Sequence, residues 1–260
     1  MYYGMRQLNY CWRVLATGWC FFSFSVGGLL LVTLVFPLIR LTEKDPFLCR
    51  DKIQKAIHNS FRFFIGQMKY LGVMSVELHG ADQLKHAQGV LVLANHPTLI
   101  DVVLMISLMP RADCIVKESL WRHKGFGGVI KAAGYIPNRN AEQLVQDCKA
   151  VLDQQRPLIV FPEGTRTTPG QAPNFQRGAS HIALHAQAPI LPVVIQCDPP
   201  SLTKDKRWYE IPARRFHVRL EVKPPCTVQD FLTEELEKPL AARQLTRSLQ
   251  QYFAKELMAL

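Results

Sequence analysis

The longest apolar stretch of the chain lies near its amino end. Residues 14–39 contain no charged side chain, and this run is longer than the roughly 20 residues that a helix needs to cross a bilayer. Arg13 and Arg40 bracket the run, and Trp12 and Trp19 lie near its amino end, where interfacial anchors are often found. The pattern predicts an N-terminal membrane helix.

The flanking sequence indicates how this helix is used. No small-residue cleavage site follows the run, which favours a retained anchor over a cleaved signal peptide. Basic residues are denser after the run than before it, so the positive-inside bias places the body of the chain in the cytoplasm, at the cytoplasmic membrane. Two alternatives stay open: a buried helix of a soluble fold, and a hairpin that dips into one leaflet and bends at Gly27, Gly28 and Pro37.

A second amphipathic segment covers residues 47–71. Its apolar side chains recur at spacings of three and four, which predicts a helix. They are Ile53, Ile57, Phe61, Phe64, Met68 and Leu71, and the accompanying basic residues are Arg50, Lys52, Lys55, Arg62 and Lys69. A basic amphipathic helix after an anchor predicts an interfacial element in the headgroup region. The alternative is a helix packed on the domain core.

From residue 75 onward, patterns typical of strands and helices alternate. The predicted strands cover residues 75–79, 90–94, 114–117, 158–161, 190–196 and 217–222. The predicted helices cover residues 97–109, 141–155 and 178–187, with a last helix whose apolar stripe is Leu245, Leu249, Phe253 and Leu257. This alternation predicts an α/β fold with a largely parallel central sheet flanked by helices. We expect a membrane and interfacial part over residues 1–72 and a globular domain over residues 73–260.

Composition narrows the set of partners. The chain has 31 Lys and Arg against 21 Asp and Glu, a net charge of +10, so it should attract anions such as nucleic acid, anionic membranes or phosphorylated substrates. The basic residues are diffuse and form no nucleic-acid-binding module, so nucleic acid is not expected. Seven scattered cysteines without a Cys-x-x-Cys pair predict neither a disulfide framework nor a metal site.

Two segments contain candidate chemistry. His96 follows a predicted strand and Asp101 lies five positions later, so a non-helical turn is needed to bring the two side chains together. In such a pair the carboxylate orients the imidazole, whose other nitrogen can accept a proton from an alcohol. The second segment, Phe161-Pro162-Glu163-Gly164-Thr165-Arg166, follows a buried strand, and ligand loops collect at such strand ends.

Four blocks together resemble the glycerolipid acyltransferase family, which includes the lysophosphatidate acyltransferases. Residues 95–101 resemble its His-x4-Asp motif, and residues 161–166 resemble its Glu-Gly-Thr-Arg block. Residues 134–139 are similar to its second block, with Asn138 in place of the usual acidic residue, and residues 190–194 to its fourth. Lys117 lies where relatives have a lysine. The resemblance covers roughly residues 75–225 and includes the four blocks in order.

The resemblance implies an O-acyltransferase that moves a fatty acyl group from acyl-carrier protein or acyl-CoA to a lysophospholipid, most specifically 1-acyl-glycerol-3-phosphate. His96 would be the general base and Asp101 its orienter. Lys117, Arg139 and Arg166 would bind an acceptor phosphate, and backbone N–H groups in the Glu163-Gly164-Thr165 loop would stabilise the thioester oxygen. No metal or bound cofactor is expected, because the thioester is a co-substrate; membrane lipids and the acyl donor are the expected partners.

Two other functions fit the same residues. A same-family enzyme could use another acceptor, such as an amino-acid lipid, a glycolipid or a polyene lipid. A non-catalytic, membrane-anchored lipid-binding protein belongs to another class, but binding alone would not need both His96 and Asp101.

Overall fold

The computed structural model of the chain describes residues 2–125, 127–232 and 237–260. The strands are β1 (Met74–His79), β2 (Leu91–Ala94), β3 (Asp113–Lys117), β4 (Ile136–Asn138), β5 (Leu158–Val160), β6 (Ile190–Asp198) and β7 (Phe216–Val222). They form one sheet in the order β1-β7-β6-β2-β5-β3-β4. The five strands from β6 to β4 are mutually parallel, and β7 is antiparallel to β6. The predicted α/β fold with a largely parallel sheet is confirmed.

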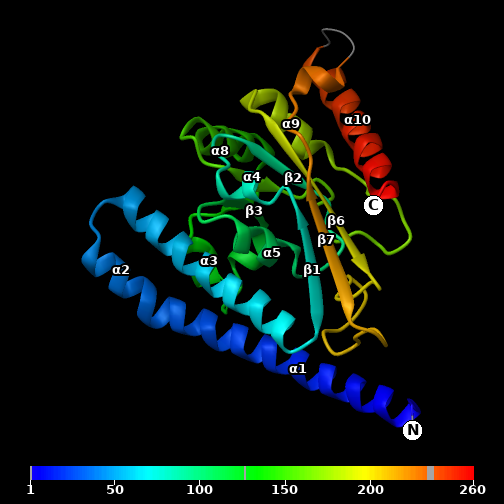
Figure 1. The fold of residues 1–260 in the computed structure, drawn as a ribbon. Helices are drawn as coiled ribbons and strands as arrows, with labels where there is room; N and C mark the ends of the chain where they lie inside the picture. Colours follow the sequence, from blue (N-terminus) through cyan, green and yellow to red (C-terminus); the bar gives the residue numbers. More distant parts are fainter. Residues whose placement is uncertain (1, 126, 233–236) are drawn as a thin grey trace.

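Helices cover both faces of this sheet (Figure 1). The long helices are α3 (Pro46–Tyr70), α5 (Asp101–Leu108), α8 (Ala141–Asp153), α9 (Arg177–Ala186) and α10 (Lys238–Met258); the short ones are α4 (Asp82–Lys85), α6 (Glu118–Trp121), α7 (Gly127–Ala132) and a 3-10 turn over Val228–Phe231. Alternate residues of β2 point to opposite faces. Val92 and Ala94 join the hydrophobic cluster under α3 and α5, whereas Leu91 and Leu93 join the one under α8, α9 and α10.

The amino-terminal helix is continuous over the predicted membrane segment. Helix α1 (Tyr2–Leu30) passes through a π-helical turn (Leu31–Val35) into α2 (Phe36–Thr42). A π turn directly before Pro37 has a physical reason, because proline lacks an N–H and its ring crowds the preceding turn. The chain reverses only after Thr42, so the described helix has no hairpin at Gly27, Gly28 or Pro37. By length and composition, Met5–Thr42 could cross a membrane.

Helix α3 shows what covers the apolar stripe that was predicted over residues 47–71. It begins at an Asp45 cap, whose carboxylate accepts hydrogen bonds from the N–H groups of Phe47 and Leu48. The predicted stripe is turned toward the protein: Ile53, Ile57, Phe64 and Met68 are at most 2% exposed. Burying that stripe under the sheet and α5 removes this face of α3 from any bilayer, as the alternative of a helix packed on the core expected. An interfacial role for the rest of the helix stays a prediction.

The same hydrophobic cluster extends across the expected boundary at residue 72. It contains Cys20 and Phe36 from the amino-terminal helix, Ile57 from α3, and Val92 and Val193 from the sheet. Helices α1 and α3 lie side by side along the body (Figure 1), with the Phe21 and Phe64 rings 5.9 Å apart. The division into residues 1–72 and 73–260 stays a prediction.

Helix α5 is shorter than predicted at its amino end. The expected helix over residues 97–109 begins only at Asp101, because residues 97–100 form a turn. Asp101 accepts a hydrogen bond from the backbone N–H of Thr98 (2.7 Å), a contact made by this turn. The other strands and helices predicted with bounds from residue 75 onward agree with the structure to within one or two residues, and the three-residue strand β4 was not predicted.

Candidate active site

His96 and Asp101 are in direct contact at the carboxyl end of β2. The His96 Nδ1 atom lies 2.8 Å from Asp101 Oδ2, with the imidazole 17% exposed and the carboxylate fully buried. Asn95 fixes the end of the strand, because its side-chain amide exchanges two hydrogen bonds with the backbone of Ile195 on β6 (2.8 and 2.7 Å). The turn over residues 97–100 therefore brings the pair together as its five-residue spacing required.

Thr98 holds the Asp101 carboxylate in place. Its hydroxyl donates to Asp101 Oδ1 (2.5 Å) and its backbone N–H donates to Oδ2 (2.7 Å), and the residue is fully buried. Donors on both oxygens fix the orientation of the carboxylate toward His96. The sequence analysis missed Thr98. The Thr-x-x-Asp spacing before the apolar run of α5 is a capping-box signal that could have found it.

Glu163 connects the loop after β5 to the backbone of His96. The Glu163 Oε1 atom accepts from the His96 N–H (2.9 Å) and from the Thr167 hydroxyl (2.8 Å), and the Thr167 N–H donates to the His96 carbonyl (2.7 Å). Burial raises the pKa of the Glu163 carboxyl above its usual range, although the two donors oppose this. The structure thus gives Glu163 two partners inside the protein, and Thr167 is a second residue that the sequence analysis missed.

The rest of this loop lies next to the imidazole. The Phe161 ring is 4.5 Å from the His96 ring, and Gly164 has a positive φ of 64° that suits glycine. The Gly164 N–H donates to the Phe161 carbonyl (3.0 Å), so it is already used. Among the described residues, the N–H groups of Glu163 and Thr165 donate no hydrogen bond, which leaves two of the three expected donors available.

The three basic residues expected at an acceptor phosphate are in different surroundings. Arg166 Nη1 donates to the carbonyls of Leu202 (3.0 Å) and Thr203 (2.9 Å). Lys117 ends β3, and the Arg139 guanidinium stacks 5.3 Å above the Trp121 ring.

These three side chains are not joined to the His96 pair. None of them contacts His96, Asp101 or Glu163 through a hydrogen bond or ion pair in the described part of the chain. Strand β4, which precedes Arg139, is three strands from β2, about 14 Å at the usual strand spacing.

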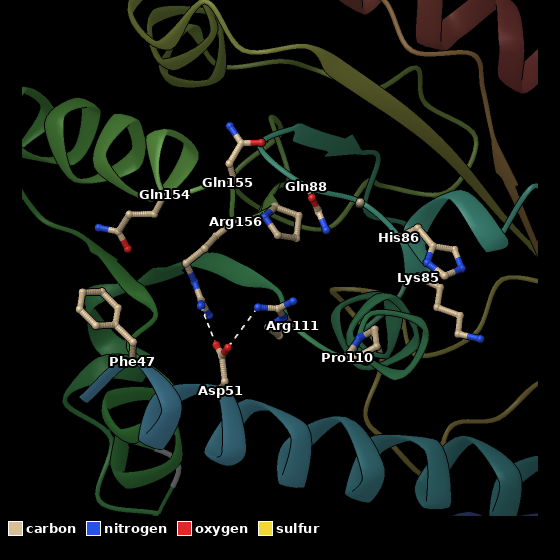
Figure 2. Close-up of a pocket in the computed structure, with 12 residues that line it drawn as sticks. Phe47, Asp51, Lys85, His86, Gln88, Pro110, Arg111, Gln154, Gln155 and Arg156 are labelled. Carbon is tan, nitrogen blue, oxygen red and sulfur yellow. Dashed lines mark hydrogen bonds and ion pairs between the residues drawn. The ribbon is translucent and has the colours of Figure 1, made fainter. Parts of the chain in front are cut away.

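A cavity of about 600 Å³ lies at the amino ends of the parallel strands, opposite the strand ends that carry His96. Residues that precede β2, β3 and β5 line it (Figure 2). Arg111 Nη1 and Arg156 Nη1 both bind Asp51 of α3, at 3.1 and 2.6 Å. Arg156 Nε also binds the fully buried Asp113 (2.7 Å), which Arg50 contacts as well. These pairs attach α3 to the sheet, and the cavity is separate from the His96 pair. Within the described ranges, no group of His, Cys, Asp or Glu side chains could hold a metal ion.

Comparison with known proteins identifies the family. The family model described as Acyltransferase matches residues 75–196, which include His96, Asp101 and the Glu163–Arg166 loop. The 1-acyl-sn-glycerol-3-phosphate acyltransferase of Helicobacter pylori is 34% identical over 162 residues, 60% of this chain and 68% of that protein. The chain belongs to the acyltransferase family. The resemblance carried by the four sequence blocks is therefore confirmed.

Two further similarities concern the sequence and the fold. The mouse 1-acyl-sn-glycerol-3-phosphate acyltransferase alpha is 29% identical over 182 residues, which are 67% of this chain and 63% of the mouse protein, so the chain spans less than two thirds of that relative. The crystal structure of the 1-acyl-sn-glycerophosphate acyltransferase from Thermotoga maritima superposes with a TM-score of 0.67, covering 95% of this chain and 98% of the other at 20% identity. This acyltransferase family member therefore has the same overall fold as that structure.

Proposed function

We propose that the chain is a membrane-attached O-acyltransferase that moves a fatty acyl group from a thioester donor to the free hydroxyl of 1-acyl-glycerol-3-phosphate, giving phosphatidate. The observation that carries the proposal is the His96–Asp101 contact of 2.8 Å within the matched family region. The relatives' printed activities suggest the acceptor. The donor is acyl-carrier protein or CoA loaded with the fatty acid.

His96 would act as the general base. In the neutral imidazole, an Nδ1–H that donates to the Asp101 carboxylate leaves Nε2 as the acceptor, and among the described residues Nε2 makes no hydrogen bond. Nε2 takes the proton of the acceptor hydroxyl while its oxygen attacks the thioester carbonyl carbon. A C–O bond forms, the C–S bond breaks, and the departing thiolate takes the proton back from the imidazolium, which Asp101 stabilises meanwhile.

Charge develops on the thioester oxygen during this attack and needs donors. The N–H groups of Glu163 and Thr165 are the proposed donors. They have no partner among the described residues, and they follow β5, the direct neighbour of β2 in the sheet. The Glu163 side chain, by contrast, would act by fixing the His96 backbone rather than by binding substrate. No step uses a metal or a bound cofactor.

Arg166 is the best-placed phosphate ligand of the three basic residues. Its Nη1 is engaged by two backbone carbonyls, which orients the guanidinium and leaves Nη2 and Nε for phosphate oxygens. Lys117 and Arg139 stay candidates at the β3–β4 side of the same sheet edge. Their distance from β2 suits a long lipid acceptor or the phosphates of a donor better than a short headgroup.

The membrane attachment is proposed from exposed apolar surface. Most of the large hydrophobic side chains left exposed in the described structure lie on α1, α2 and α3, and contiguous apolar surface of this kind marks a membrane or protein interface. Those on α1, α2 and the π-helical turn between them include Leu8, Leu15, Trp19, Phe22, Leu30, Leu34, Leu38 and Leu41. Because the body of the protein packs along the amino-terminal helix, we propose that this helix lies in one leaflet of the membrane and that the active site is on the cytoplasmic side.

Acyl transfer by the purified chain in phosphatidylcholine vesicles tests the function. Labelled acyl-CoA and acyl-carrier protein are offered with 1-acyl-glycerol-3-phosphate, with the same acceptor lacking its phosphate, and with lysolipids of other headgroups. We expect the largest kcat/KM for the phosphate monoester. Preference for a glycolipid or amino-acid lipid would replace the acceptor assignment, and no transfer from either donor to any acceptor would contradict the enzyme proposal.

A further inference from the structure

The segment between β6 and β7, residues 199–215, forms a loop at the same sheet edge as His96; we call it the β6–β7 loop. Its first part is joined to the active site. The Leu202 carbonyl accepts hydrogen bonds from the Leu99 N–H (3.0 Å) and from Arg166 Nη1 (3.0 Å), and the Thr203 carbonyl accepts a second bond from that Arg166 nitrogen (2.9 Å). The position of this backbone therefore sets the position of the Arg166 guanidinium.

The second part of the loop is joined to the amino-terminal helix. Arg13, which is 2% exposed, donates from Nη1 to the Pro212 carbonyl (3.0 Å) and from Nη2 to the Ala213 carbonyl (2.6 Å). The Trp208 ring packs on Gly18, where an added Cβ would come within 3.2 Å of it. The loop therefore connects the apolar helix α1 to the residue that we assign to the acceptor phosphate.

The outer surface of the loop combines positive charge with aromatic rings. Residues 204–215 contain five basic side chains against Asp205 and Glu210; the basic ones are Lys204, Lys206, Arg207, Arg214 and Arg215. Trp208 and Tyr209 are 45% and 38% exposed. Lys204, Lys206 and Arg207 make no ion pair among the described residues, whereas Arg214 pairs with Asp198 (2.7 Å).

We infer that the β6–β7 loop is a second membrane contact, which binds anionic phospholipid headgroups beside α1 and thereby positions Arg166. Exposed indole and phenol rings between cationic side chains suit the headgroup region, where the ring is half in hydrocarbon and half in water. Each basic residue near an anionic leaflet strengthens attraction about fivefold. An acidic carrier protein would also attract the charge, but continuity with the apolar surface of α1 favours lipid. The regulation of Arg166 rests on the proposed function, whereas the membrane contact does not.

Tryptophan fluorescence tests the contact without requiring activity. In a full-length variant that keeps Trp208 alone, lipids brominated near the glycerol end should quench its emission in vesicles containing phosphatidylglycerol. The other three tryptophans become phenylalanine: Trp12, Trp19 and Trp121. Adding Lys204→Gln, Lys206→Gln and Arg207→Gln should remove about half or more of the quenching, given the fivefold effect of each charge. A control set on α10, which lies far from α1 (Figure 1), should leave the quenching unchanged. This set is Arg243→Gln, Arg247→Gln and Lys255→Gln.

The same two sets, made in the chain with all four tryptophans, test the link to Arg166. On phosphatidylglycerol vesicles the loop set should raise the KM for the phosphate acceptor with little change in kcat, and the α10 set should leave both unchanged. Absence of quenching, or equal quenching in purely zwitterionic vesicles, would overturn the inference. Unquenched Trp208 with a raised KM for the acyl-carrier donor alone would assign the surface to that protein instead. If no acyl transfer occurs at all, the quenching result still decides the membrane contact.

Discussion

Thr98→Val is the substitution that most specifically probes the support of the His96–Asp101 pair. Valine has nearly the shape of threonine and keeps the backbone N–H that binds Asp101 Oδ2, so the only group lost is the hydroxyl that donates to Oδ1 at 2.5 Å. Asp101 is fully buried, and Oδ1 has no other donor among the described residues. The variant therefore leaves one carboxylate oxygen buried without a partner.

The magnitude follows from the charge on that oxygen. A hydrogen bond to a charged group contributes about 1.5–3 kcal/mol, so the free energy of unfolding should fall by about that amount. The carboxylate, now held by one oxygen, can rotate away from His96 Nδ1, so kcat should fall about 10- to 100-fold with little change in KM. The measurements are thermal unfolding of the purified chain and acyl-transfer kinetics at a temperature where both variants are folded.

Thr98→Ser is the matched control, because it keeps the hydroxyl and removes only a methyl group. It should retain most of the activity and lose about 1 kcal/mol of stability through the small cavity. A Val variant as active and as stable as the natural chain would refute the argument that Thr98 holds Asp101, and equal kcat losses in Val and Ser would assign the effect to packing.

Three further substitutions test other parts of the structure. Glu163→Gln keeps an oxygen for the His96 N–H and removes a carboxylate whose pKa is raised by burial. Burial destabilises the natural chain only when this carboxylate is ionised, so the stability of the Gln variant relative to the natural chain should grow as pH rises above about 4.3. A stability difference that does not change with pH would contradict this. Arg166→Lys keeps the charge but loses the planar fork that can hold two backbone carbonyls with one nitrogen and phosphate oxygens with the others. The value of kcat/KM should fall more than about tenfold on the phosphate acceptor and less on its dephosphorylated analogue, and equal losses would remove the phosphate assignment. Arg156→Met removes one partner of the buried Asp113 and should lower the free energy of unfolding by about 3–5 kcal/mol. Lys149→Met, in an exposed ion pair, is the control and should lower it by less than about 1 kcal/mol. Similar small losses in both variants would show that the buried network contributes little.

The sequence predicted the sheet well because its strands are short, buried and separated by amphipathic helices. It missed β4, whose three residues Ile136–Asn138 include a proline and are too few to show a period. It began the helix after β2 at residue 97, because a proline in a first turn is common. In the structure, residues 97–100 instead form the turn in which Thr98 contacts Asp101. This contact is local, and the Thr-x-x-Asp spacing indicates it, but hydrophobic periodicity does not.

The amphipathic segment over residues 47–71 shows a second limit. Helical spacing indicates that one face is apolar, but not whether lipid or protein covers it. The structure buries Ile57 and Met68 completely and exposes Phe63 and Tyr70 on another face. Similarly, the spacing of His96 and Asp101 allowed their contact, whereas the distances of Lys117 and Arg139 from it depend on the strand order β2-β5-β3-β4, which no local pattern reveals.

The central claim is that His96 and Asp101 act as one unit in acyl transfer, and a double-mutant cycle on kcat/KM tests it most directly. His96→Ala should reduce transfer to 1-acyl-glycerol-3-phosphate by about 10²- to 10⁴-fold, and Asp101→Ala should reduce it by a similar or smaller factor. If Asp101 works through His96, the double variant should be no slower than His96→Ala alone. A His96→Ala variant with near-natural turnover, or two losses that multiply in the double variant, would contradict the account.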